Sequence, residues 1–381
     1  MWNLLKIKKI TIFDPQWKGE YLSEMIFGKQ VTEKDITCLL NSKLGKRDWY
    51  FANSGSASLY FILKSFGCQK GDEVLVPVYL CPSVFKVILD LSMKPIYCDI
   101  DPADLNISIK SIKEKTTDKS KFVIVPSLYG NPANILEIKR QFPDLIIIDD
   151  AAQAYGANLS NQPVGTMGDA GFYAVGPGKP LFGVKGSVYW TSGQYRVSPT
   201  RSSKIITFFS YLSFIYNRVF LSKTQYFPFS VIGKFIYYSY LIIHKVFFSY
   251  SNKIDSIDVK AMHMLMVEFE QRNKENTNCI IKELRELFAS SGLGVVLSPL
   301  RGSGISFKLV VLCNSPKVRR AFENALDRSS IFYSVGYQLG NRYYDKNAFP
   351  GLVSVLEKIL ELPLPTNSCQ LELLKKAIKA I

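Results

Sequence analysis

Short apolar segments alternate with helical patterns between residues 50 and 190, and this alternation constrains the fold more than any other feature of the sequence. Helical patterns such as Ser56–Phe66 and Pro82–Leu91 separate the segments. Uninterrupted apolar segments of four or five residues are typical of a parallel sheet that helices cover on both faces. The sequence therefore predicts an α/β fold. The predicted strands are Glu73–Val76, Pro95–Cys98, Phe122–Pro126, Leu145–Asp149 and Gly186–Trp190.

The 381 residues leave room for two or three domains. We predict an N-terminal arm and large domain over residues 1–200, and an aromatic and basic helical insertion over residues 201–253. A connecting helix and a small C-terminal α+β domain are predicted over residues 254–381. Within this last region, a helical pattern extends from Ile257 to Ser290, and another ends the chain at Gln370–Ile381.

The positive charge of the chain is concentrated in its middle. Lys and Arg number 47 and Asp and Glu number 32, which gives a net charge of 47 − 32 = +15. The stretch between Asp169 and Asp255 contains ten basic residues and no acidic one. Sixteen of the 47 residues in Lys204–Tyr250 are Phe or Tyr, and the longest uncharged run there, 13 residues, is too short to span a bilayer. Pro228 and Gly233 predict two helices joined by a turn.

We predict that residues 204–250 form a subunit interface or a substrate lid, because exposed apolar patches usually mark protein contacts. A peripheral contact with an anionic membrane is the alternative, because aromatic and basic side chains together suit the membrane interface. Lys234 and Lys245 would then lie on nearly one helix face. Nucleic-acid binding is not expected, since large apolar runs interrupt the basic residues and no recognised motif is present.

The seven cysteines are widely spaced, form no CxxC pair, and are accompanied by only two histidines. This pattern predicts neither a disulfide framework nor a metal site. The N-terminal residues contain no sustained apolar run, so no signal peptide is expected. We expect a cytoplasmic protein, and any peripheral membrane contact would be at the inner face.

Two candidate ligand-binding motifs lie at the predicted ends of strands. Asn53-Ser54-Gly55-Ser56 precedes a helix, where backbone N–H groups can bind a phosphate, although the same residues also suit a plain helix cap. Asp150 ends a buried strand, at the edge where α/β sheets bind ligands. Its carboxylate would suit a cationic ring nitrogen there, or it caps the following helix.

Two further motifs concern turns. Lys179 lies in a Gly- and Pro-rich turn that is not a phosphate-binding Walker A loop, because Tyr173 and Pro180 replace the required Gly and Ser/Thr. Taken alone, such a lysine is either functional or a solvated charge. Gly71-Asp72-Glu73 predicts a turn that leads into a strand.

In order and spacing, these motifs resemble the DegT/StrS family of sugar aminotransferases, which use pyridoxal phosphate (PLP). The resemblance begins near Trp49, includes Ser127–Pro132, and returns weakly at Leu362–Pro365. It implies the type I fold of PLP-dependent transferases. Such a fold has a mostly parallel seven-stranded sheet between helices and a smaller C-terminal α+β domain.

The resemblance also implies a role for each candidate residue. Lys179 would hold PLP covalently and then move protons. Asp150 would keep the ring nitrogen of PLP protonated, because a nearby anion favours the charged form of that nitrogen. Gln153 would face the 3-hydroxyl group of PLP. The phosphate cradle would consist of Ser54, Gly55 and Ser56.

Several positions depart from the family pattern. Ala174 replaces a serine that contacts the phosphate. Cys81 stands where an aromatic ring normally stacks on PLP, so the resemblance implies that Cys81 contacts the cofactor, with Tyr79 as a candidate substitute. Asp258–Met262 lacks the Asn-x-Arg-Met motif of the neighbouring subunit, and Tyr333–Gln338 lacks the Pro-rich substrate loop with its histidine. The cofactor half of the site is therefore predicted to be kept, and the substrate half to be changed.

The function implied by the resemblance is transfer of an amino group from glutamate or glutamine to a nucleotide-linked keto-sugar, in surface-polysaccharide or glycan biosynthesis. A homodimer is expected, because sites of this fold usually lie at a subunit boundary. A PLP-dependent sugar dehydratase or lyase stays open as an alternative, although Lys179 argues against dehydratases that carry histidine there. A catalytically degenerate, membrane-associated scaffold of the same fold is the other alternative.

Overall fold

The structure of the chain is a computed structural model. It describes residues 23–24, 27–199, 204–216, 238–239, 241–243, 249–271, 274–337, 348–365 and 367–381. The predicted turn at Pro228–Gly233 and the predicted face with Lys234 and Lys245 lie outside the described residues.

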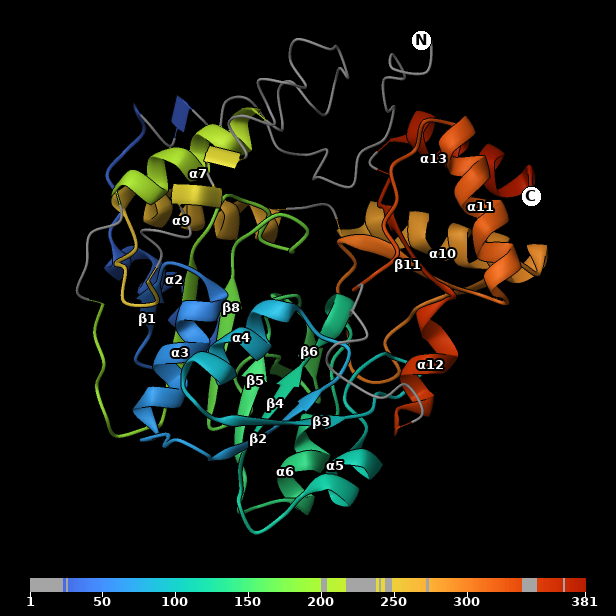
Figure 1. Ribbon diagram of the computed structural model, residues 1–381. Helices are drawn as coiled ribbons and strands as arrows, with labels where there is room; N and C mark the ends of the chain where they lie inside the picture. Colours follow the sequence, from blue (N-terminus) through green and yellow to red (C-terminus); the bar gives the residue numbers. More distant parts are fainter. Residues whose placement is uncertain are drawn as a thin grey trace.

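A seven-stranded sheet lies at the centre of the large part of the molecule (Figure 1). Its strand order is β1-β9-β8-β5-β4-β2-β3. Strand β9 is antiparallel to both of its neighbours, β1 and β8, and the other adjacent strands pair in parallel, so the predicted mostly parallel seven-stranded sheet is confirmed. The strands are β1 (Tyr50–Ala52), β2 (Glu73–Pro77), β3 (Lys94–Cys98), β4 (Ser120–Pro126), β5 (Ile146–Asp150), β8 (Ala170–Ala174) and β9 (Ser187–Thr191).

Helices cover both faces of this sheet, which explains why its strands lack polar alternation. Every residue of β2 and β8 is buried. On one face, the core includes side chains of α2 (Glu33–Leu44), α5 (Ile109–Lys115), α6 (Ile135–Gln141) and α9 (Ser256–Gln271). On the other face, it includes side chains of α3 (Gly55–Ser65), α4 (Pro82–Asp90) and α12 (Pro350–Leu356).

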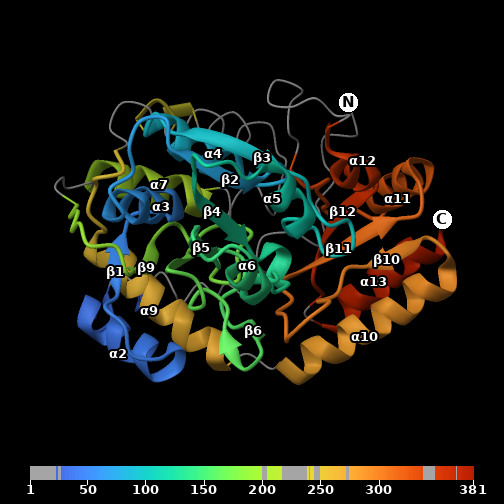
Figure 2. The ribbon, with the colours of Figure 1, turned by 90° about the horizontal axis from the view of Figure 1, so that it is seen from below.

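A C-terminal unit with its own core lies beside the large sheet (Figures 1 and 2). Its antiparallel sheet has the order β10-β11-β12. This unit agrees with the predicted small α+β region, while the predicted domain boundaries remain predictions. Besides α12, the unit contains α10 (Lys274–Ser291), β10 (Gly294–Val296), β11 (Lys308–Cys313), α11 (Pro316–Arg328), β12 (Ile359–Pro363) and α13 (Ser368–Lys379).

The described part of the predicted insertion begins with α7 (Lys204–Tyr216), which lies against α9. Tyr211 on α7 and Ala261 on α9 share a small apolar cluster. The opposite face of α7 exposes Phe208 and Leu212. Among the described residues, no helix is long and apolar enough to cross a membrane. The remaining elements are the short helix η2 (Leu128–Gly130) and the hairpin of β6 (Asn158–Leu159) and β7 (Gln162–Pro163).

Candidate active site

The predicted phosphate cradle is the first turn of α3. The Ser54 hydroxyl accepts a hydrogen bond from the Ala57 backbone N–H at 3.2 Å, so Ser54 is a helix cap. The first N–H groups of a helix have no acceptor within the helix and carry a partial positive charge. The cap and the cradle are therefore compatible, since the Ser54 side chain satisfies one of these groups and leaves others for a phosphate.

Gly55 brings the lysine and the cradle together. A Cβ atom placed on Gly55 would lie 3.1 Å from Cβ of Ala174 and 3.7 Å from Nζ of Lys179. The lysine amine is therefore adjacent to the N-terminus of α3, although more than 120 residues separate the two in sequence. Because Gly55 has no side chain, the space between the amine and the helix end stays open.

Lys179 lies in a tight turn between β8 and β9. Its backbone N–H donates to the Gly176 carbonyl oxygen at 3.3 Å, and Gly178 adopts a left-handed conformation with φ of 72°. Burial lowers the pKa of the Lys179 amine, although the nearby Asp150 and Cys81 act in the opposite direction. A lowered pKa enlarges the fraction of neutral amine, which is the nucleophilic form.

The two adjacent aspartates at the end of β5 have different environments. Asp149 accepts hydrogen bonds from the backbone N–H groups of Gly165 and Met167 and therefore supports a loop. Asp150 accepts one from the Ala152 N–H at 3.0 Å. Burial raises the pKa of Asp150 to about 6, and the Ala152 hydrogen bond and the Lys179 charge oppose this rise. A cation beside Asp150 would therefore stabilise its carboxylate form.

The amide of Gln153 is held at both ends. Its Oε1 accepts a hydrogen bond from the Tyr129 backbone N–H at 2.9 Å, and its Nε2 donates one to the Tyr337 hydroxyl at 2.5 Å. Tyr129 has a left-handed backbone with φ of 57°, which is uncommon for a residue with a side chain. The sequence predicted Gln153, but Tyr337 lies in a segment where only a missing motif had been noted.

Cys81 and Tyr79 flank the same region from the β2–α4 connection. Cys81 precedes α4 and lies near enough to Lys179 and Tyr337 to influence the pKa values of both groups. Tyr79 is fully buried, and its hydroxyl lies 2.6 Å from that of Tyr129. The predicted cofactor contact of Cys81 stays a prediction.

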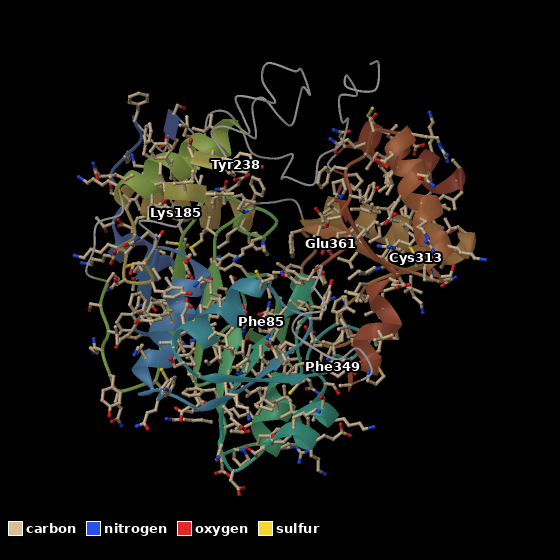
Figure 3. The ribbon with its side chains drawn as sticks, viewed as in Figure 1. Phe85, Lys185, Tyr238, Cys313, Phe349 and Glu361 are labelled. Carbon is tan, nitrogen blue, oxygen red and sulfur yellow. The ribbon has the colours of Figure 1, made fainter. Side chains whose placement is uncertain are left out.

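A second lysine supports the cradle and was not predicted from the sequence. Nζ of Lys185 donates to Oδ1 of Asn53 at 2.9 Å and to the Thr207 hydroxyl at 2.8 Å. It also lies 3.0 Å from Oδ2 of the fully buried Asp258. Figure 3 labels Lys185 beside α7 and α9. This lysine thus links the residue before the cradle to the insertion and to α9.

These residues provide a partner for each polar group of PLP. Backbone N–H groups at Ser54–Ser56 suit its phosphate, the Asp150 carboxylate suits its ring nitrogen, and the Gln153 amide suits its phenolic oxygen. The amine of Lys179 suits its aldehyde. The site therefore fits this cofactor, and among the described residues no group of His, Cys, Asp and Glu side chains could hold a metal ion.

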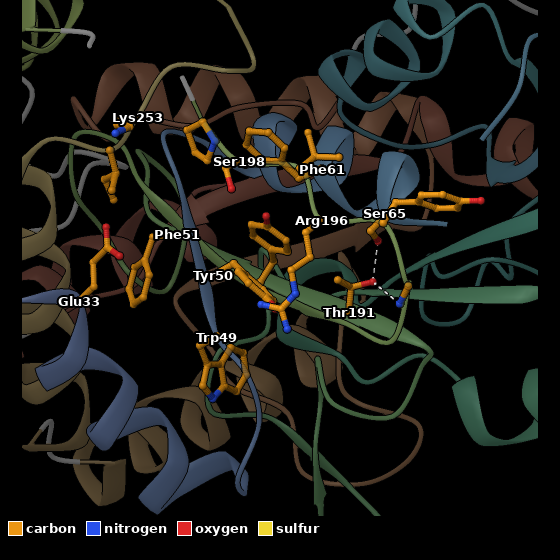
Figure 4. A pocket seen from close by; sticks show the side chains of 16 residues that line it. Glu33, Trp49, Tyr50, Phe51, Phe61, Ser65, Thr191, Arg196, Ser198 and Lys253 are labelled. Carbon is orange, nitrogen blue, oxygen red and sulfur yellow. Dashed lines mark hydrogen bonds between the residues drawn. The ribbon is translucent and has the colours of Figure 1, made fainter. Parts of the chain in front are cut away.

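A separate cavity of about 400 Å³ lies beside β1 and β9 (Figure 4). Its lining includes Trp49, Tyr50, Arg196 and Lys253, and none of the predicted site residues. The guanidinium group of Arg196 lies 5.8 Å from the ring centre of Tyr50. The cavity is therefore distinct from the lysine site.

The fold is the type I fold of PLP-dependent transferases, as predicted from the sequence. A solved aminotransferase, TlmJ from Streptoalloteichus hindustanus, has a TM-score of 0.74 with this chain at 16% identity, covering 97% of this chain and 98% of that one. A GDP-4-keto-6-deoxy-D-mannose-3-dehydratase of Escherichia coli, solved with bound hydrated PLP, has a TM-score of 0.70 with this chain at 16% identity. The match covers 98% of this chain and 100% of that one.

Residues 34–192 match the model of the DegT/DnrJ/EryC1/StrS aminotransferase family, which confirms the resemblance over this part of the chain. GDP-perosamine synthase of Escherichia coli O157:H7 is 28% identical over 173 residues, 43% of this chain and 48% of that protein. GDP-4-keto-6-deoxy-D-mannose 3-dehydratase of Escherichia coli O55:H7 is 33% identical over 180 residues, 45% of each. The matched segments thus span less than half the length of these curated relatives.

Restoring a hydroxyl at Ala174 is expected to strengthen PLP binding. The Cβ atom of Ala174 faces the cradle beside Gly55, and a serine there would add one hydrogen bond to a charged phosphate. We expect Ala174→Ser to lower the dissociation constant of PLP about fivefold in a titration of cofactor-free protein. Ala170→Ser, at the other end of β8, is the control and should leave the affinity unchanged. Equal or weaker binding by Ala174→Ser would contradict this geometry.

Proposed function

We propose that this chain is a PLP-dependent aminotransferase that transfers an amino group from glutamate or glutamine to a keto-sugar attached to a nucleotide. The observation that carries the proposal is the position of the Lys179 amine at the first turn of α3. Its Nζ lies 3.7 Å from the point that a Cβ atom on Gly55 would occupy, and this point is open because Gly55 has no side chain. A phosphate at this helix end would hold a small cofactor directly beside the amine. The buried Asp150 would then face the opposite end of the cofactor ring.

Each residue has a chemical task in this proposal. When bound, PLP would withdraw electrons from the amino-bearing carbon and make a proton on that carbon removable. Lys179, with its lowered pKa, would accept this proton and return it at the end of the transfer. Asp150 would hold a proton on the ring nitrogen, and Gln153 would orient the ring through its phenolic oxygen.

A nucleotide-linked sugar is proposed as the substrate because the names of two relatives, GDP-perosamine synthase and GDP-4-keto-6-deoxy-D-mannose 3-dehydratase, refer to GDP-sugars. A role in surface-polysaccharide or glycan biosynthesis follows from the same reasoning. We also propose a homodimer in which residues 204–250 contribute to the subunit interface or to a substrate lid. Peripheral contact of this segment with a membrane stays the alternative.

The spectrum of the purified protein tests the first half of the reaction. We expect protein prepared with excess PLP to show visible absorbance from the lysine-bound cofactor. Adding glutamate or glutamine should convert this absorbance to that of pyridoxamine phosphate, because the amino group moves to the cofactor. Absence of bound PLP would reject the proposal and favour the degenerate scaffold, while bound PLP that neither donor changes would reject these two amino acids as donors.

A sugar dehydratase is the second candidate, because the 33% identical relative is a 3-dehydratase. The two reactions differ in their products. With a GDP-linked 4-keto-6-deoxy sugar as the probe, a transaminase would give an aminated sugar, whereas a dehydratase would release water and leave no nitrogen on the sugar. Mass spectrometry of the nucleotide-sugar product separates these outcomes.

A further inference from the structure

The amide of Gln153 has one orientation that satisfies its neighbours, because the Tyr129 backbone N–H is a donor and can only meet Oε1. Nε2 must therefore lie on the other side of the amide. One of its two N–H groups is directed to the Tyr337 hydroxyl at 2.5 Å. The second has no partner among the residues that the structure describes and is available to a ligand, so the contact with Tyr337 determines where that second N–H group points.

Tyr337 is itself held by Tyr79. The Tyr337 backbone N–H donates to the Tyr79 hydroxyl at 3.3 Å, and the two rings meet edge to face with their centres 5.2 Å apart. Gly336 makes this approach feasible, since a Cβ atom there would lie 2.3 Å from the Tyr79 hydroxyl oxygen. Its φ of 74° is also a conformation that favours glycine.

A relay of hydrogen bonds ends on a buried carboxylate of the C-terminal unit. The Tyr129 hydroxyl donates its single proton to Oε1 of Glu361 at 2.7 Å. The Tyr79 hydroxyl lies 2.6 Å from the Tyr129 hydroxyl and must therefore be the donor in that contact. Lys308 donates to Oε2 of Glu361 at 2.9 Å. Burial raises the pKa of Glu361, but the Lys308 charge and the hydrogen bonds outweigh this effect and keep the pKa below its usual value. Glu361 is therefore an ionised acceptor at neutral pH.

We propose that Tyr337 is a positioning residue of the PLP site: its hydroxyl fixes the Gln153 amide so that the second N–H group of Nε2 faces the phenolic oxygen of PLP. This inference rests on the proposed function. The Tyr79–Tyr129–Glu361 relay holds Tyr337 in place, so the C-terminal unit sets the orientation of a cofactor contact that belongs to the large sheet. Glu361 is labelled in Figure 3, in the C-terminal unit.

Tyr337→Phe tests the proposal because it keeps the ring and removes only the hydroxyl. We expect the dissociation constant of PLP to rise about fivefold, and the absorbance maximum of bound PLP to shift, because its phenolic oxygen loses a well-oriented donor. The melting temperature of the cofactor-free protein should not change. Tyr333→Phe is the matched control, since the hydroxyl of that tyrosine bonds to Asp327 on the exposed surface.

Wild-type affinity and an unshifted spectrum in Tyr337→Phe would overturn the proposal. A loss of affinity that is matched by a loss of thermal stability without PLP would also overturn it, because Tyr337 would then have only a structural role. Equal changes in Tyr333→Phe would do the same. Failure of the proposed function is separable from these results, since it would appear as absence of PLP binding in the wild-type protein.

Discussion

Replacing Lys179 with alanine is expected to abolish covalent attachment of PLP and to reduce amino transfer by a factor of about 10² to 10⁴. The variant loses both the nucleophilic amine and the group that moves the proton, while Asp150, Gln153 and the cradle keep their contacts. Borohydride reduction followed by peptide mass spectrometry measures the attachment directly. The mass of reduced PLP should appear on the peptide that contains Lys179 in the wild type, and on no peptide of the variant.

The environment of Lys179 distinguishes it from its neighbour Lys185. Burial lowers the pKa of Lys179, whereas Lys185 is held as a donor to Asn53 and Thr207 and is paired with Asp258. Reduced PLP attached to Lys185 in the wild type would contradict Lys179 as the lysine that binds the cofactor. Lys86→Ala is a suitable control, because the Lys86 side chain is 64% exposed and should be irrelevant to attachment.

Asp258→Asn is expected to destabilise the fold by about 3–5 kcal/mol, because it leaves the charge of Lys185 buried without its partner. The Asp258 side chain is 0% exposed and the Lys185 side chain 11%, so little water is available to replace the lost contact. Chemical denaturation at neutral pH measures this effect. PLP affinity should fall as well, since Lys185 holds Asn53 directly before the cradle.

The double variant Lys185→Met/Asp258→Leu separates the cost of an unpaired charge from the value of the pair. Burial raises the pKa of Asp258 against the opposing effect of Lys185, so ionising this carboxylate is itself costly. The double variant should therefore recover much of the lost stability. Glu114→Gln, in the exposed pair of Lys110 and Glu114, should leave the unfolding midpoint unchanged. Equal stabilities of Asp258→Asn and wild type would show that the pair is not needed.

The sequence predicts the large sheet well, because its parallel strands are buried on both faces and appear as continuous apolar runs. The predicted strand Phe122–Pro126 lies within β4, and the predicted helix Ser56–Phe66 is shifted by one residue from α3. Strand β8 was not predicted as a strand. Its residues were interpreted as part of the turn motif around Lys179, because Gly171 and the glycines that follow it conceal a five-residue buried strand.

The candidate site also contains some residues that the sequence predicts and others that it does not. Asp150 ends β5, and Ser54 and Lys179 lie in the connections that follow β1 and β8. Because these three strands run parallel, the convergence of the three residues at one sheet edge could be expected. Tyr337 and Lys185 could not be predicted, because their roles arise from contacts between segments far apart in sequence. The only sequence signals were the glycine directly before Tyr337 and an acidic residue, Asp258, in the segment that lacks the Asn-x-Arg-Met motif.

The relay from Tyr79 through Tyr129 to Glu361 has a consequence for recombining this chain with its relatives. The family match ends at residue 192, whereas the acceptor of the relay lies on β12. A chimera with a foreign C-terminal half would inherit two tyrosine hydroxyls but not their buried carboxylate. Unless the incoming half carries an acceptor at that place, those hydroxyls lose their partner at a cost in folding free energy. Tyr79, Tyr129 and Glu361 should therefore be exchanged together, across what would otherwise be a convenient junction for domain shuffling.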